Sequence, residues 1–156
     1  MGLSYETQLG KSGEHLVCAD LILQGYNAFL ADEGQSYDVL VDNRYTVIKI
    51  QVKSTNKFKV VNKVYNQPVY LFNLLTNRER STIREIDTDY YAFVALDTRK
   101  IAYFPIKHLV TNNGLIKRQM IFKSRGYKYK VFTYPNGKEI PQTRKYLEDY
   151  SKFTIQ

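Results

Sequence analysis

The chain has 156 residues, the size of one domain, and 44% of them are hydrophobic, which is enough to bury a sizeable core. Apolar runs such as residues 90–96 are too short to span a bilayer, and the N-terminus lacks a secretory signal. We therefore expect a cytoplasmic protein with no membrane partner. A single cysteine excludes an internal disulfide bond.

The net charge of +8 is unevenly distributed along the chain. Residues 1–54 contain four basic and seven acidic residues, a net of −3, whereas residues 55–156 contain nineteen and eight, a net of +11. Between Lys117 and Lys145 there are nine basic residues, one acid and several aromatics. Such a band neutralises phosphates and favours a nucleic-acid partner, although charge alone leaves a solvated basic face equally open.

The first predicted element is a helix at residues 6–24, because an apolar stripe at helical spacing ends there at Gly25. Residues 37–41 and 45–54 predict a hairpin around the turn 42–44, whose residues suit a tight turn. The remaining predicted elements are strands at 26–30, 69–75, 90–97 and 101–104, a short helix at 106–110, a turn at 135–137 and a short helix from Thr143. A helix followed by a mixed sheet indicates an α/β or α+β fold.

Polar residues line one face of the predicted strand at 45–54. Lys49, Gln51 and Lys53 alternate with apolar residues, and Asp38 lies on the preceding strand. Polar residues on one strand face are usually the solvent side. The strand is otherwise strongly apolar, as expected of a central strand, where a glutamine and a lysine need a reason to be present.

Glu14 lies on the buried stripe of the predicted helix rather than with Lys11 and His15. An ionised carboxylate in this position needs a cation or strong hydrogen bonds. A divalent metal ion shared with Asp38 would supply the cation, and a buried ion pair with Lys53 is the structural alternative. The two histidines have no second ligand at zinc spacing, and there is no glycine-rich ATP-binding loop.

Together these residues resemble the signature of the PD-(D/E)xK nucleases. In that family an aspartate at the end of one strand is followed, on the next strand, by an acid or amide, one apolar residue and a lysine. Here the pattern is Asp38, then Gln51-Val52-Lys53, and the helix with Glu14 matches an acidic residue that many members carry. The glutamine makes the chain most similar to the group I intron-encoded homing endonucleases of this superfamily. The resemblance covers roughly residues 6–105.

The resemblance implies a site for Mg²⁺, with Asp38 as the central ligand, Glu14 binding directly or through water, and the Val52 carbonyl completing the protein ligands. Lys53 would orient or deprotonate the attacking water and stabilise the transition-state charge. Because Gln51 replaces the usual acid, the site has one negative charge fewer, and we expect either a single well-held metal ion or weaker affinity at a second position. The catalytic residues predicted are therefore Glu14, Asp38, Gln51 and Lys53.

The implied fold is a restriction-endonuclease-like α/β core, with a mixed central sheet flanked by helices and a basic, β-rich C-terminal extension. We expect one nuclease domain over residues 1–156, with the catalytic core at about 6–110 and the DNA-contacting extension at about 111–156. The residues predicted to contact DNA are Lys49, Arg118, Lys123, Arg125, Lys128 and Lys130.

The favoured function is a site-specific homing endonuclease that cuts double-stranded DNA with a divalent metal ion. A double-strand break by one active site per chain requires a homo-oligomer, either a dimer or a tetramer. A Holliday-junction resolvase or restriction-type nuclease on the same fold remains an alternative. So does a DNA-binding module without catalysis, for which the glutamine is the argument.

Overall fold

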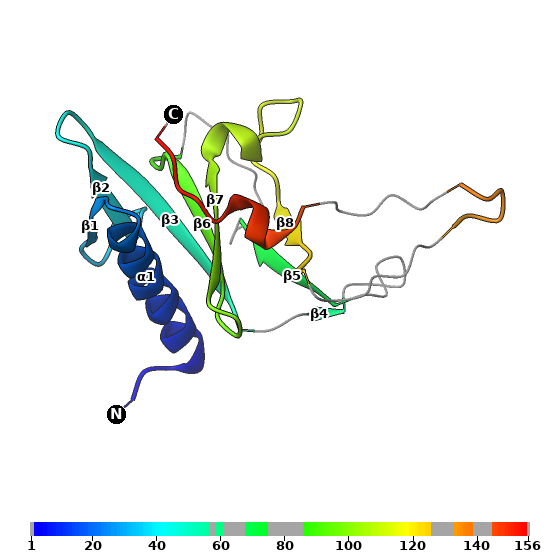
Figure 1. Cartoon of the computed structure of the whole chain (residues 1–156), viewed down its shortest axis with the longest axis horizontal. Coiled ribbons are helices and arrows are strands. Elements are labelled where there is room, and N and C mark those ends of the chain that lie inside the picture. The colour runs from blue at the N-terminus through cyan, green and yellow to red at the C-terminus, as the bar shows by residue number, and fades with distance from the viewer. Residues whose placement is uncertain are drawn as a thin grey trace.

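The computed structural model describes residues 2–56, 59–60, 68–74, 86–125, 133–138 and 145–155. Across these residues, one long helix packs on one face of a five-stranded sheet, and a three-stranded sheet packs on the opposite face (Figure 1). None of the helices within these ranges combines the length and apolar character needed to cross a membrane.

Helix α1 (Tyr5–Leu23) begins after Ser4, whose Oγ accepts a hydrogen bond from the Thr7 backbone N–H at 3.2 Å. It ends before Gly25, which takes a left-handed conformation with φ of 94°. Its fully buried residues are Gly13, Val17 and Leu21. The helix predicted at residues 6–24 is thus confirmed to within one residue at each end.

The central sheet has the strand order β1-β2-β3-β6-β7. Its strands are β1 (Asn27–Leu30), β2 (Val39–Asp42), β3 (Val47–Thr55), β6 (Tyr90–Ala95) and β7 (Lys100–Pro105). Neighbouring strands are antiparallel except β3 and β6, which pair in parallel, so the sheet is mixed as predicted. Every residue of β6 is buried, because both faces of this strand are covered.

The turn between β2 and β3 forms where the sequence predicts it. The Asp42 carboxylate accepts a hydrogen bond from the Arg44 N–H at 2.8 Å, and the Asn43 side-chain oxygen accepts one from the Thr46 N–H at 2.8 Å. These bonds set the register of the hairpin, in which Val39 pairs with Ile50.

The second sheet consists of β4 (Lys59–Val60), β5 (Pro68–Asn73) and β8 (Gln119–Phe122). Its Phe72 and Phe122 rings lie 5.1 and 5.4 Å from the Phe93 ring of β6, which joins the two sheets in one aromatic core. The central sheet was expected to be flanked by helices. Within the described residues the second face is covered by this sheet, and the predicted helix at 106–110 is the 3₁₀ helix η2 (Ile106–Leu109). Because β8 comes from the predicted extension, part of that extension belongs to the core.

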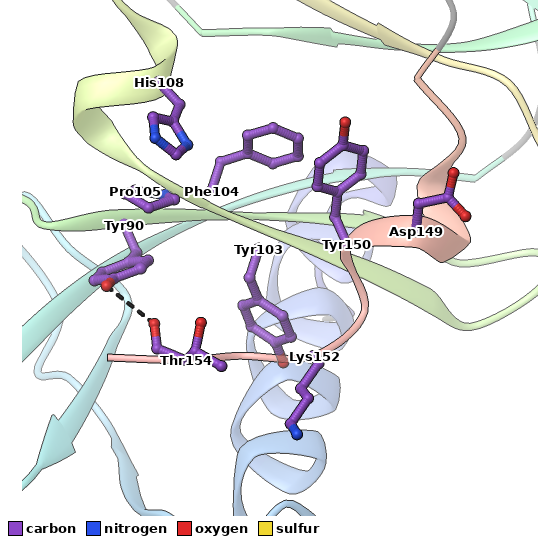
Figure 2. A pocket seen from close by; sticks show the side chains of 9 residues that line it. All are labelled: Tyr90, Tyr103, Phe104, Pro105, His108, Asp149, Tyr150, Lys152 and Thr154. Carbon is purple, nitrogen blue, oxygen red and sulfur yellow. Dashed lines mark hydrogen bonds between the residues drawn. The ribbon is translucent and has the colours of Figure 1, made fainter. Parts of the chain in front are cut away.

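The C-terminal residues cross the edge of the central sheet after the 3₁₀ helix η3 (Leu147–Tyr150). Phe153 is completely buried, and its ring lies 4.9 Å from that of Tyr90. The Tyr90 hydroxyl donates to the Thr154 carbonyl at 3.1 Å, beside a cavity of about 250 Å³ (Figure 2). Thr143, where a helix was predicted to begin, lies outside the described residues.

Candidate active site

Asp38 immediately precedes β2 and is held in place by its backbone. Its N–H donates to the Ile50 carbonyl at 2.9 Å, and its carbonyl accepts from the Ala31 N–H at 2.9 Å. Its side-chain Oδ2 accepts two further hydrogen bonds, from Gln51 Nε2 at 2.9 Å and from the Val52 N–H at 2.7 Å. Three of the predicted site residues are therefore brought together by hydrogen bonds that fix the Asp38 carboxylate.

Strand β3 presents its two faces differently. Ile50 and Val52 are buried in the core beneath α1, so Gln51 and Lys53 lie on the opposite face, as the alternation predicts. The N–H and C=O of one residue point to the same side of a strand. Because the Val52 N–H donates to Asp38, the Val52 carbonyl is also directed to that side.

Glu14 approaches the same place from α1. The neighbouring Gly13 lies against β3, where an added Cβ would be in ordinary van der Waals contact with Val52 Cγ1 at 3.5 Å. This contact brings Glu14 into electrostatic range of Asp38, whose negative charge raises the pKa of Glu14. Glu14 of α1 and Lys53 of β3 are thus both within electrostatic range of Asp38.

Burial dominates the electrostatics of the three charged groups. It raises the pKa of Asp38, although the Val52 N–H and the Lys53 charge act to lower it. Burial, and then the Asp38 charge, raise the pKa of Glu14. Burial lowers the pKa of Lys53, and Asp38 opposes this. Within the described ranges, neither Glu14 nor Lys53 has an ion-pair or hydrogen-bond partner for its side chain, so the alternative of a Glu14–Lys53 ion pair does not form.

The oxygen atoms in this arrangement fit a magnesium ion. Burial makes both half-buried carboxylates, Asp38 and Glu14, costly to ionise, and the Asp38 charge adds to that cost for Glu14; a divalent cation would offset it. The Val52 carbonyl adds a neutral oxygen, and magnesium keeps several of its waters. No group of three histidine, cysteine, aspartate or glutamate side chains gathers anywhere in the described part of the chain.

Lys49 lies on the same face of β3 but has a different environment. Its Nζ forms an ion pair with Asp87 at 2.6 Å and lies 5.1 Å from the centre of the Tyr37 ring. The nearby Asp89 carboxylate accepts a hydrogen bond from the Lys49 N–H at 2.8 Å. Lys49 is therefore beside the site and already paired with an exposed acid.

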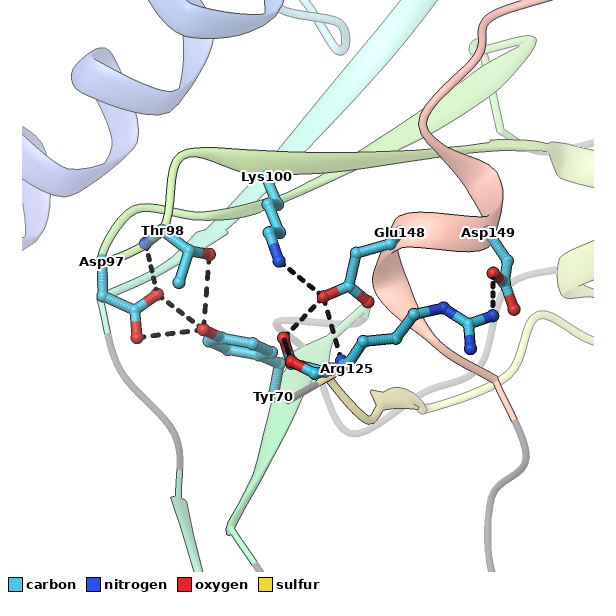
Figure 3. A network of polar contacts seen from close by, with 8 residues as sticks. Tyr70, Asp97, Thr98, Lys100, Arg125, Glu148 and Asp149 are labelled. Atoms are coloured by element: carbon cyan, nitrogen blue, oxygen red, sulfur yellow. Dashed lines mark hydrogen bonds and ion pairs between the residues drawn. The ribbon is translucent and has the colours of Figure 1, made fainter. Parts of the chain in front are cut away.

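The basic residues predicted to contact DNA are dispersed. Arg118 is exposed, whereas Arg125 forms an ion pair with Asp149 (Figure 3) and stacks over the Tyr146 ring at 4.6 Å. Lys123 joins the C-terminal segment through its backbone, which accepts from the Leu147 N–H at 3.0 Å. Lys128 and Lys130 lie outside the described residues.

Two residues near the site were missed from the sequence. Tyr91 pairs in register with Gln51 across β3 and β6, and burial followed by the Asp38 charge raises its pKa. Lys11 was expected on the exposed side of the helix, but its positive charge lowers the pKa of both Glu14 and Asp38. No local signal reveals Tyr91, because it sits in an apolar run whose partner strand is distant in sequence.

Known proteins resemble this chain in sequence and in fold. The family model described as PD-(D/E)XK endonuclease matches residues 5–129. A bacterial homing endonuclease, I-Ssp6803I, has a similar structure with a TM-score of 0.55 and 17% identity over 83% of this chain and 83% of that chain. The Holliday junction resolvase Hjc of Archaeoglobus fulgidus gives a TM-score of 0.44 and 15% identity over 71% of this chain and 82% of that one. No curated protein matches the chain. The predicted restriction-endonuclease-like core is confirmed.

Proposed function

Because the chain belongs to the PD-(D/E)XK endonuclease family, we propose that it hydrolyses phosphodiester bonds in double-stranded DNA with the help of Mg²⁺. The single observation that carries this proposal is that Asp38, fixed against β3, lies within electrostatic range of both Glu14 and Lys53. The Asp38 carboxylate is fixed by two hydrogen bonds, while the other two charged groups have no partner within the described residues. Groups that are buried, charged and unpaired are costly unless a ligand uses them.

The role of each residue follows from its position. Asp38 and Glu14 would hold the metal ion with the Val52 carbonyl. When bound, the ion neutralises charge on the phosphoryl oxygens and makes a water molecule easier to deprotonate. Lys53 has a lowered pKa and an unpaired ammonium group on the same face as Gln51, so it is suited to orient the attacking water and to stabilise the developing negative charge.

Within this family, two features support a homing endonuclease. Gln51 occupies the position where an acid is usual, which is the pattern of the group I intron-encoded homing endonucleases that the sequence resembles. The similar fold of a bacterial homing endonuclease over 83% of both chains is consistent with it. One active site per chain cuts one strand, so a double-strand break requires at least a dimer of this chain. The basic residues beyond Lys117 would supply the contacts to the DNA backbone.

A plasmid-nicking assay tests the proposal. Supercoiled plasmid should be nicked or linearised in the presence of magnesium and left intact in EDTA. If cleavage occurs, selection of cut sites from a random DNA library should return one long, defined target. Binding of DNA without cleavage in magnesium or manganese would contradict the proposed activity and favour a non-catalytic DNA-binding module. Cleavage of four-way junctions in preference to linear duplexes would favour a resolvase.

A further inference from the structure

The N-terminal third of the chain is acidic, yet three of its four basic residues lie at or beside the candidate site. Residues 1–54 have a net charge of −3 and contain four basic residues. Lys53 faces the site itself, Lys49 lies on the same face of β3, and Lys11 is one helical turn before Glu14 on α1. Because the surrounding sequence is acidic, this concentration of lysines at one place calls for a partner that is negatively charged.

Lys11 is held by a glutamate from the loop that leads into Asp38. Its Nζ lies 2.9 Å from Glu33 Oε1, and the two side chains are 40% and 85% exposed. Residues i and i+3 of a helix lie on one face, so Lys11 and Glu14 are neighbours. The electrostatic effect of Lys11 on both Glu14 and Asp38 agrees with this position.

Lys49, on β3, forms a similar ion pair with an exposed acid. Its Nζ pairs with Asp87 at 2.6 Å, and the Asp87 side chain is 62% exposed. In both pairs the acid is more exposed than the lysine and comes from a connecting segment rather than from the sheet or helix. Each lysine is therefore fixed on a regular element, while its acidic partner lies on the solvent side of it.

We propose that Lys11 binds a backbone phosphate of DNA next to the site. While the protein is free of DNA, Glu33 forms an ion pair with Lys11 in place of that phosphate. Asp87 pairs with Lys49 in the same way. The proposal rests on the proposed function, since it assumes that the substrate is DNA. It adds a phosphate contact at Lys11 and an exchange of partners at two lysines.

The energetics favour such an exchange. An exposed ion pair is weak, because both groups keep much of their hydration and the long side chains lose freedom. A phosphodiester carries the same single negative charge as a carboxylate, so the lysine changes partner at little net cost. The two acids also repel DNA whose phosphates do not reach the lysines to displace them, which disfavours binding at loosely fitting sites.

The test is equilibrium binding of a 30-base-pair duplex, measured by fluorescence anisotropy over a range of salt concentrations. Calcium replaces magnesium in this assay so that cleavage does not interfere. Glu33→Gln should bind up to about fivefold more tightly than the unmodified chain, the factor expected for an exposed ion pair that no longer has to be broken. Lys11→Gln should bind more weakly, with the slope of log K against log salt reduced by about 0.9.

Asp32→Asn is the matched control, because Asp32 is an exposed neighbour of Glu33 and has no ion-pair partner within the described residues. It removes the same charge from the same loop and should change affinity much less than Glu33→Gln. In the double variant Lys11→Gln/Glu33→Gln, the gain from Glu33→Gln should disappear. Asp87→Asn and Lys49→Gln should behave as the second pair.

The outcomes separate the two proposals. If the unmodified chain neither binds nor cuts duplex DNA, the proposed function fails. Suppose instead that the unmodified chain binds and cuts DNA. If Glu33→Gln then binds DNA no more tightly than Asp32→Asn, or more weakly than the unmodified chain, the ion pair only anchors the loop. The proposed exchange of partners is then wrong. An unchanged salt slope in Lys11→Gln would remove Lys11 from the DNA interface.

Discussion

Gly13 of α1 lies directly over Ser54 of β3, so close that a Cβ added to Gly13 would stand 1.8 Å from the Ser54 Oγ. The Ser54 hydroxyl is buried and has no hydrogen-bond partner within the described residues. Glu14 follows Gly13 in the helix, so this contact sets the distance between the helix carboxylate and the strand that carries Gln51 and Lys53. A glycine, although a poor helix former, is needed here because only a hydrogen fits.

Gly13→Ala should therefore displace α1 from β3. The expected result is a loss of about 1–3 kcal/mol of unfolding free energy, typical of overpacking a core, together with reduced cleavage because Glu14 moves away from Asp38. Urea unfolding and the nicking rate measure both effects. Adding Ser54→Ala to Gly13→Ala removes the nearest clashing atom and should recover part of the loss. No recovery would mean that the close approach does not determine the position of the helix.

Removing either central charge should abolish cleavage and preserve DNA binding. We expect Asp38→Ala and Lys53→Ala to lower the nicking rate by about 100-fold or more, the loss typical of removing a group that stabilises the transition state. Binding measured by anisotropy in calcium should remain within a few-fold of the unmodified chain. Asp42→Ala, at the opposite end of β2, is the control and should still cleave. Cleavage by all three variants at the normal rate would show that other residues form the active site.

Gln51 should affect metal binding through Asp38. Its amide Nε2 donates to Asp38 Oδ2 at 2.9 Å, and partners of this kind typically change metal affinity by about 10- to 100-fold. Gln51→Met keeps the length of the side chain and removes the donor. The magnesium concentration that gives half-maximal cleavage should rise by that factor, while Tyr91→Phe, on the adjacent strand, should change it less. The same magnesium midpoint in Gln51→Met and the unmodified chain would argue against this role.

The basic residues of the C-terminal part should determine the salt dependence of DNA binding. Each phosphate contact contributes about 0.9 to the slope of log K against log salt, so replacing both Lys128 and Lys130 by alanine should reduce the slope by about 1.8. Arg118→Ala should reduce it by about 0.9, because Arg118 is exposed and its side chain has no partner in the described part of the chain. If a variant keeps the slope of the unmodified chain, the residue that it replaces does not contact a phosphate.

Glu148 should make the stability of the fold dependent on acid. Burial acts to raise its pKa, but Lys100 at 2.7 Å, the Ser124 hydroxyl at 2.6 Å and the Arg125 N–H at 3.0 Å donate to its Oε1 and lower the pKa below the ordinary value of 4.5 (Figure 3). A carboxylate whose pKa is lower in the folded than in the unfolded state stabilises the protein at pH values above its unfolded pKa. That stabilisation is lost as the pH falls through the pKa of the folded state.

The unmodified chain should therefore exceed Glu148→Gln in unfolding free energy by about 2 kcal/mol at neutral pH, as for a hydrogen-bonded charged group, and the difference should shrink below pH 4.5. Urea unfolding at several pH values measures it. Glu6→Gln, which replaces an exposed glutamate of the first turn of α1, should show little difference at any pH. A difference for Glu148→Gln that grows toward acid pH would show that the pKa is raised instead.

Several features of the site were predictable because they depend on local backbone geometry. A strand places alternate side chains on opposite faces, so Gln51 and Lys53 were expected on one face whatever the sheet order. Likewise, the apolar stripe of α1 placed Glu14 on its inner side, and the turn residues at 42–44 set the register that brings Asp38 opposite β3. Spacing along the chain is sufficient for each of these inferences.

Other features depended on contacts between residues far apart in sequence. The parallel pairing of β3 with β6 brings Tyr91 beside Gln51, and the acids that hold Lys11 and Lys49 come from two different loops. The order of strands and the packing of α1 through Gly13 decide these contacts, because each depends on the burial of surfaces contributed by the whole chain. The amino-acid sequence by itself therefore determined which residues share a face, whereas the tertiary structure decided which faces meet.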